Sequence, residues 1–76
     1  MYTHEETIIL AKLALEDQHL TAQVGSLKAC REIAAKYGWS LSFAEERLDD
    51  ADDVWCAETK SMTPTEKQAY KTALKG

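Results

Sequence analysis

The sequence predicts an all-α domain, a compact bundle of four short helices at about residues 4–19, 26–37, 42–59 and 64–75. The 76-residue chain has one Pro and three Gly, and it is rich in Ala, Leu, Glu and Lys. This composition favours helices, because such side chains lose little freedom there. Apolar residues recur at three- and four-residue steps, and helix-capping residues precede these segments. A chain of this length is expected to form one domain, residues 1–76.

The first helix is predicted to begin after Thr3, because Thr3 and Glu6 have the spacing of a capping box. Its end is expected near Gln18–Leu20. Between these points apolar residues cover most of the circumference, and only a strip near Lys12 is clearly polar. An arc this wide indicates a central helix, or one that also packs against a second copy, so we expect a homodimer.

The second helix, 26–37, follows a connection in which Gly25 breaks the helical pattern and Ser26 is the expected N-cap. Gly38 stands where a left-handed residue commonly ends a helix, and Trp39 is the apolar residue that folds back on it. One face of this helix is predicted to be buried, at Leu27, Cys30, Ile33, Ala34 and Tyr37.

The third helix, 42–59, is expected to begin at Ser40 or Ser42, and Ser42 and Glu45 have the spacing of a second capping box. Apolar residues at helical spacing predict one buried stripe. Its members are Ala44, Leu48, Ala51, Val54 and Trp55.

The fourth helix, 64–75, has the clearest start. Thr63 is the expected N-cap, Pro64 takes the first helical position and Glu66 takes the third. The apolar side comprises Ala69, Tyr70, Ala73 and Leu74.

Residues 33–48 combine small, glycine and apolar residues at fixed steps: Ile33-Ala34, Gly38, Trp39-Ser40, Ala44 and Leu48. This spacing resembles the helix-turn-helix corner of lactose-repressor-type bacterial regulators. The resemblance implies a corner in which small Ala34 lets two helices cross and Gly38 makes the turn. It covers this segment only, and it indicates the shape more than DNA binding.

In that family the first turns of the second helix enter the major groove of DNA. The corresponding positions here are Leu41, Ser42, Phe43, Glu45 and Glu46. None is Arg, Lys, Asn or Gln, which make the usual base contacts. The formal net charge of −4 also disfavours phosphate binding. A DNA-binding transcriptional regulator is therefore the alternative function, with nucleic-acid contacts from Lys28, Arg31, Lys36, Lys67, Lys71 and Lys75.

Seven acids and one base, Arg47, lie between Glu45 and Glu58. Several acids are three or four residues apart, and each such like-charge pair destabilises a helix by about 0.2–0.5 kcal/mol. Three interpretations are open. The acids form a solvated face that the fourth helix partly neutralises within the chain or across a dimer, a docking face for a basic partner protein, or a divalent-cation site. The last is weak, because the alternating ligands and central Gly of an EF-hand are absent.

Little in the sequence suggests catalysis. His4 and His19 lie about 22 Å apart on one helix, so they cannot share a metal ion or substrate within one chain. The common nucleophile, metal and phosphate-loop motifs are absent. Cys30 falls on a face predicted to be buried. We expect a protein without enzymatic activity, cofactor or metal.

The sequence begins with no recognisable signal peptide, and it contains no apolar run long enough to span a membrane. Two cysteines are too few for a secreted disulfide scaffold. These features predict a cytoplasmic protein.

The sequence therefore favours a small binding protein that acts by protein–protein contact, as an inhibitor or accessory regulator that imitates a nucleic acid backbone or simply presents acids. The expected partner is a protein with a basic surface, because apolar anchors beside charges are typical of protein interfaces. The small size suits a product of a phage or mobile element. The predicted partner-binding residues are Leu41, Phe43, Glu45, Glu46, Asp49, Asp50, Asp52 and Asp53.

Overall fold

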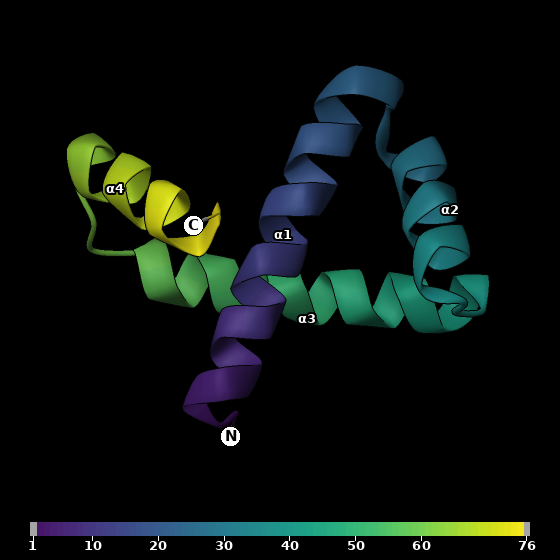
Figure 1. The fold of residues 1–76 in the computed structure, drawn as a ribbon, viewed down its shortest axis with the longest axis horizontal. Coiled ribbons are helices and arrows are strands. Elements are labelled where there is room, and N and C mark those ends of the chain that lie inside the picture. Colours follow the sequence, from purple (N-terminus) through teal and green to yellow (C-terminus); the bar gives the residue numbers. More distant parts are fainter. Residues whose placement is uncertain (1, 76) are drawn as a thin grey trace.

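The computed structural model describes residues 2–75, and it confirms the all-α prediction, because these residues form four helices and no strand. The helices are α1 (His4–Val24), α2 (Ser26–Tyr37), α3 (Leu41–Thr59) and α4 (Pro64–Lys75). Helices α1 and α3 cross, α2 connects them on one side, and α4 lies toward the other end of α3 (Figure 1). Helix α1 is the central element, because it packs against each of the other three.

Helix α1 begins as predicted and ends later than predicted. The Thr3 Oγ1 atom accepts the N–H of Glu6 at 3.1 Å, which satisfies one of the free N–H groups of the first turn. The predicted end near Gln18–Leu20 is wrong, because the helix continues to Val24. It ends at Gly25, whose φ of 87° few other residues adopt.

The longer α1 has a packing cause. Leu20 packs against the hydrophobic core, and this contact stabilises a further turn of helix. No Gly or Pro precedes Gly25 to interrupt that turn. Gly25 is also the N-cap of α2, so the prediction of Ser26 as N-cap is wrong, and Ser26 is the first residue of α2.

The wide apolar arc of α1 is covered mostly by helices of the same chain. Ile8 and Leu15 are half-buried, whereas Ile9 is 53% exposed. The position of α1 among three neighbours thus accounts for most of its apolar surface. The buried members of the arc are Leu10, Ala11, Leu13 and Ala14.

The turn between α2 and α3 has the predicted form. Gly38 adopts the left-handed conformation, with φ 70° and ψ 30°. The N–H groups of Gly38 and Trp39 both donate to the carbonyl oxygen of Ala34, so two backbone donors are satisfied at the end of α2. Trp39 is partly buried and packs against the core, as its place in the turn predicts.

Helix α3 begins one residue after Ser40. The Ser40 Oγ atom accepts the N–H of Phe43 at 3.2 Å, and Ser40 is the N-cap. The alternative start, with Ser42 as the cap, is wrong, because α3 already begins at Leu41 and Ser42 lies inside it. The predicted stripe of α3 is confirmed: Trp55 is half-buried, and the buried members are Ala44, Leu48, Ala51 and Val54.

The predicted buried face of α2 is only partly correct. Ile33 is fully buried, and Ala29, Cys30 and Ala34 are buried beside it. Leu27 and Tyr37, however, are 59% and 44% exposed, so the prediction of burial is wrong for both. They lie in the first and last turns of α2, beyond the part of the helix that packs in the core.

Helix α4 has the complete capping box that the sequence predicts. The Thr63 N–H donates to Glu66 Oε1 and the Glu66 N–H donates to Thr63 Oγ1, both at 3.2 Å. Its packing is lighter than expected, because Leu74 is its one buried residue within the described part of the chain. Tyr70 stacks on Trp55 with ring centroids 5.6 Å apart. The predicted apolar positions Ala69 and Ala73 are exposed.

Candidate protein-binding face

Three aromatic side chains gather where α2 meets α3, and we call this group the aromatic corner: Tyr37, Trp39 and Phe43. The rings of Tyr37 and Trp39 stack with centroids 4.7 Å apart. Trp39 and Phe43 meet edge to face with centroids 5.2 Å apart. Phe43 is 46% exposed, and the neighbouring Leu41 is 40% exposed. The corner therefore presents mutually packed aromatic rings to solvent, a type of residue enriched in protein interfaces.

The carboxylates of α3 form a second feature, the acidic face, which comprises Glu45, Glu46, Asp49, Asp50, Asp52 and Asp53. Asp50 is half-buried and the others are exposed. At about 100° per residue these side chains occupy an arc of about 160° around the helix. Leu41 falls just beyond one edge of that arc, and Phe43 falls just beyond the other. All of the predicted partner-binding residues thus lie on one helix, and all but the half-buried Asp50 are exposed.

A carboxylate from α1 extends the acidic surface beyond α3. Burial raises the pKa of Asp52, and the negative charges of Asp17, Asp49 and Asp53 raise it further. Burial also raises the pKa of Asp17, against the effect of a 3.3 Å hydrogen bond donated by Thr21 Oγ1. Asp17 therefore belongs to the same electrostatic cluster, which draws on two helices.

The two cysteines lie in different surroundings. Burial raises the pKa of the Cys30 thiol, and the charges of Glu45, Asp17 and Asp49 add to this effect. A thiol of this kind resists conversion to the reactive thiolate. Cys56 is exposed, and both cysteines are free thiols.

The acidic face has no ion-pair partner among residues 2–75. The one ion pair found there joins Lys36 Nζ to Glu16 Oε2 at 2.6 Å, between α2 and α1. Within this range, Lys67, Lys71 and Lys75 of α4 therefore form no ion pair with the acids of α3, so the partial neutralisation that the solvated-face interpretation allows within one chain is not made through ion pairs. The charges of the acidic face remain available to solvent or to another molecule.

Glu16 is held by two partners from α2. Its Oε1 atom accepts a 2.7 Å hydrogen bond from the Tyr37 hydroxyl, and its Oε2 atom pairs with Lys36. Burial acts to raise the pKa of Glu16, but these hydrogen bonds and the Lys36 charge together lower it. The same contacts raise the pKa of Lys36 and of Tyr37. This network connects the aromatic corner to α1.

The basic residues proposed as alternative nucleic-acid contacts fall into two separate groups. Lys28, Arg31 and Lys36 lie on α2, whereas Lys67, Lys71 and Lys75 lie on α4. The two helices stand at opposite ends of α3 (Figure 1), and Lys36 is paired with Glu16. The two groups do not join into one basic surface beside the helix that would read the bases.

The described part of the chain shows neither a metal site nor a helix that could span a membrane. Within residues 2–75, no group of three or more His, Cys, Asp or Glu side chains is arranged to hold a metal ion. None of the four helices combines the length and the apolar character that crossing a membrane requires.

The sequence predicts the residues of the acidic face, but it does not predict the positions of Tyr37 and Asp17. The spacing of Tyr37 predicts burial, although its position beside the helix-ending Gly38 indicates that it stands at an edge. Asp17 gave no signal, because its proximity to Asp52 depends on how α1 crosses α3. Polar residues separated by thirty or more positions come together only through tertiary packing.

Replacing Asp52 by Asn is expected to raise stability at neutral pH and to flatten its dependence on pH. Folding raises the pKa of Asp52, so the folded state binds its proton more tightly than the unfolded state does. The contribution of this group to stability therefore increases as pH falls through the raised pKa toward the ordinary carboxyl value. Asn has no charge to bury, so the variant lacks this dependence.

Urea unfolding between about pH 7 and about pH 4 measures this difference. The matched control is Glu32→Gln, which removes an exposed carboxylate from α2. Asp52→Asn should flatten the pH profile more than this control does, and equal profiles for the two variants would contradict the prediction. The lowered pKa of Glu16 acts in the opposite sense, because its stabilising contribution is lost as pH falls through that pKa.

A comparison with known proteins adds no relative to this description. No family model matches the chain, and neither does any curated protein or solved structure.

Proposed function

We propose that this chain is a small non-enzymatic binding protein that acts by contact between the acidic face of α3 and a basic surface on a partner protein. The observation that carries the proposal is the coexistence on one helix of exposed Leu41 and Phe43 with six carboxylates that have no ion-pair partner within residues 2–75. Apolar anchors would supply burial, and the charges would supply orientation and fast association. An inhibitor or accessory regulator is the role that this surface suits.

The energetics of α3 favour a functional reason for the acids. The pairs Glu45–Asp49, Asp49–Asp53 and Glu46–Asp50 are like charges one helical turn apart, and each costs about 0.2–0.5 kcal/mol. Asp is also a poor residue in a helix interior. A chain of 76 residues has a small margin of stability from which to bear these costs. A basic partner would convert the repulsion into attraction across the interface.

The homodimer predicted from α1 is not required for this function. It stays a prediction, supported by the exposed Ile9 side chain on the N-terminal half of α1.

The test compares two variants that change the net charge equally. One carries Asp49→Lys, Asp50→Lys and Asp53→Lys on the acidic face. The other carries Glu5→Lys, Glu32→Lys and Glu58→Lys, all exposed and outside that face. The immobilised chain is used to capture proteins from a lysate of the source organism, and mass spectrometry identifies those bound. The Kd of each purified candidate is then measured for all three forms of the chain.

We expect the acidic-face variant to bind the partner at least about tenfold more weakly than the control variant. Equal affinities for the two variants would contradict the proposal. Labelled duplex DNA provides the decisive comparison with the alternative function. Its titration at about 50 and about 200 mM salt should give no saturable binding. Affinity with a steep salt dependence would instead favour a DNA-binding regulator.

A further inference from the structure

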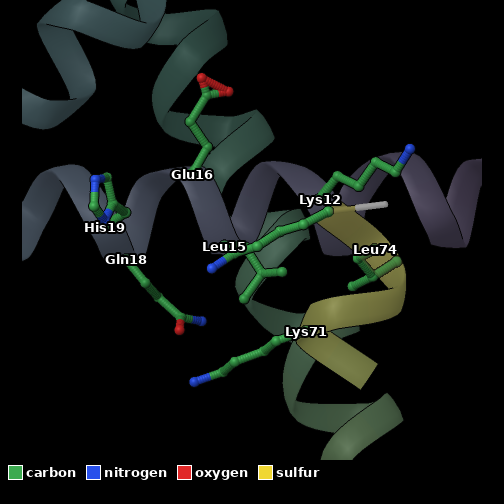
Figure 2. Close-up of a pocket in the computed structure, with 8 residues that line it drawn as sticks. Lys12, Leu15, Glu16, Gln18, His19, Lys71 and Leu74 are labelled. Carbon is green, nitrogen blue, oxygen red and sulfur yellow. The ribbon is translucent and has the colours of Figure 1, made fainter. Parts of the chain in front are cut away.

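A groove between α1 and α4 stands apart from the acidic face. It has a volume of about 580 Å³ and receives residues from both helices. Leu15 and Leu74 supply apolar surface, Lys71 and Lys75 supply positive charge, and Lys12 also lines the groove. Figure 2 shows Lys71 approaching the groove from α4 and Gln18 approaching it from α1. On a chain with a formal net charge of −4, this is a local concentration of cations.

The lysines of the groove are free to meet an external anion. Glu16 is the one acid that lines the groove, and both of its oxygens are occupied by Lys36 and Tyr37. In Figure 2 its side chain points away from Lys71. Among residues 2–75, neither Lys71 nor Lys75 has an ion-pair partner. The Glu16 carboxylate therefore does little to neutralise the positive charge of the groove lysines.

We infer that the groove binds a small soluble amphiphile with an anionic head, a carboxylate or a phosphate, on an apolar body. Lys71 and Lys75 would hold the head through charge-assisted hydrogen bonds, with the Gln18 amide as a further donor. Leu15 and Leu74 would cover the apolar body. The volume lies in the range of small-molecule sites, which combine apolar lining with a few polar groups. Both parts of the ligand are needed, because the groove has both kinds of surface.

The probes are octanoate and octyl phosphate. Their binding is measured by two-dimensional NMR of the isotopically labelled full chain. Octanol has the apolar body without the charge, while acetate and inorganic phosphate have the charge without the body. The test variant is Lys71→Glu. Its matched control is Lys67→Glu, which makes the same change one turn earlier on α4, at an exposed lysine outside the groove. Circular dichroism verifies that both variants retain their helices.

We expect saturable shifts in α1 and α4 with both amphiphiles, and affinity at least about tenfold weaker in Lys71→Glu than in Lys67→Glu. The partial probes should bind at least about tenfold more weakly than octanoate. The inference is overturned if neither amphiphile binds, if the two variants bind equally, or if acetate or octanol matches octanoate. Sedimentation that shows assembly of copies through the groove, or capture by anionic vesicles without binding of free octanoate, would assign it a different occupant and overturn it as well.

Discussion

Replacing Ile33 by Ala is expected to lower the free energy of unfolding by about 2–5 kcal/mol. Ile33 is fully buried, and it belongs to the core formed by α1, α2 and α3. The shorter side chain would lose its contacts with that core and leave a cavity that neighbouring helices fill only in part. A domain of this size has a total stability of about 4–11 kcal/mol, so the loss is a large fraction of the whole.

The matched control is Ile9→Ala, which makes the same chemical change in a helix at a site that is 53% exposed. Both variants gain the same helix propensity from Ala, so the difference between them isolates burial. We expect Ile9→Ala to change stability by no more than about 0.5 kcal/mol. Urea unfolding followed by circular dichroism measures both. Losses of equal size would show that the core is not centred on Ile33.

The features predicted best from the sequence are those determined by neighbours in the chain. Thr3 and Thr63 cap their helices because a hydroxyl lies within reach of an N–H three residues later. Gly38 ends α2 because it adopts a left-handed conformation that other residues resist. The stripe of α3 was also correct, because a helix in a small bundle buries one continuous face.

The features predicted worst depend on contacts between distant segments. The predicted end of α1 is too early, because the packing of Leu20 on the core is a tertiary contact. Tyr37 matched the buried spacing of α2, yet it reaches outward to Glu16 and stacks on Trp39. The groove between α1 and α4 gave no sequence signal, because Lys12 and Lys71 come from opposite ends of the chain. By contrast, the acidic face was predictable, since its residues share a single helix.

Replacing Leu74 by Ala is expected to release α4 from the bundle while α1, α2 and α3 stay folded. Leu74 is the one buried side chain of α4 within the described residues. The main packing partner of α4 is α1, and the stacking of Tyr70 on Trp55 adds a contact to α3. Loss of the leucine should cost about 2–3 kcal/mol, at the lower end for a buried Leu because the site lies at the edge of the core. The Tyr70–Trp55 stack supplies only about 0.5–1.5 kcal/mol. Because this is less than the stabilisation lost with the leucine, the stack alone should not hold α4 in place.

Hydrogen exchange distinguishes local release from global unfolding. In Leu74→Ala, amides of α4 should lose protection, whereas those around Ile33 in α2 should keep most of theirs. Leu27→Ala is the matched control, because Leu27 is 59% exposed and its removal should leave protection in all four helices unchanged. A uniform loss of protection in Leu74→Ala would instead show that α4 unfolds together with the rest of the chain. Local release would also open the groove, so the same variant should bind octanoate more weakly without any change at the acidic face.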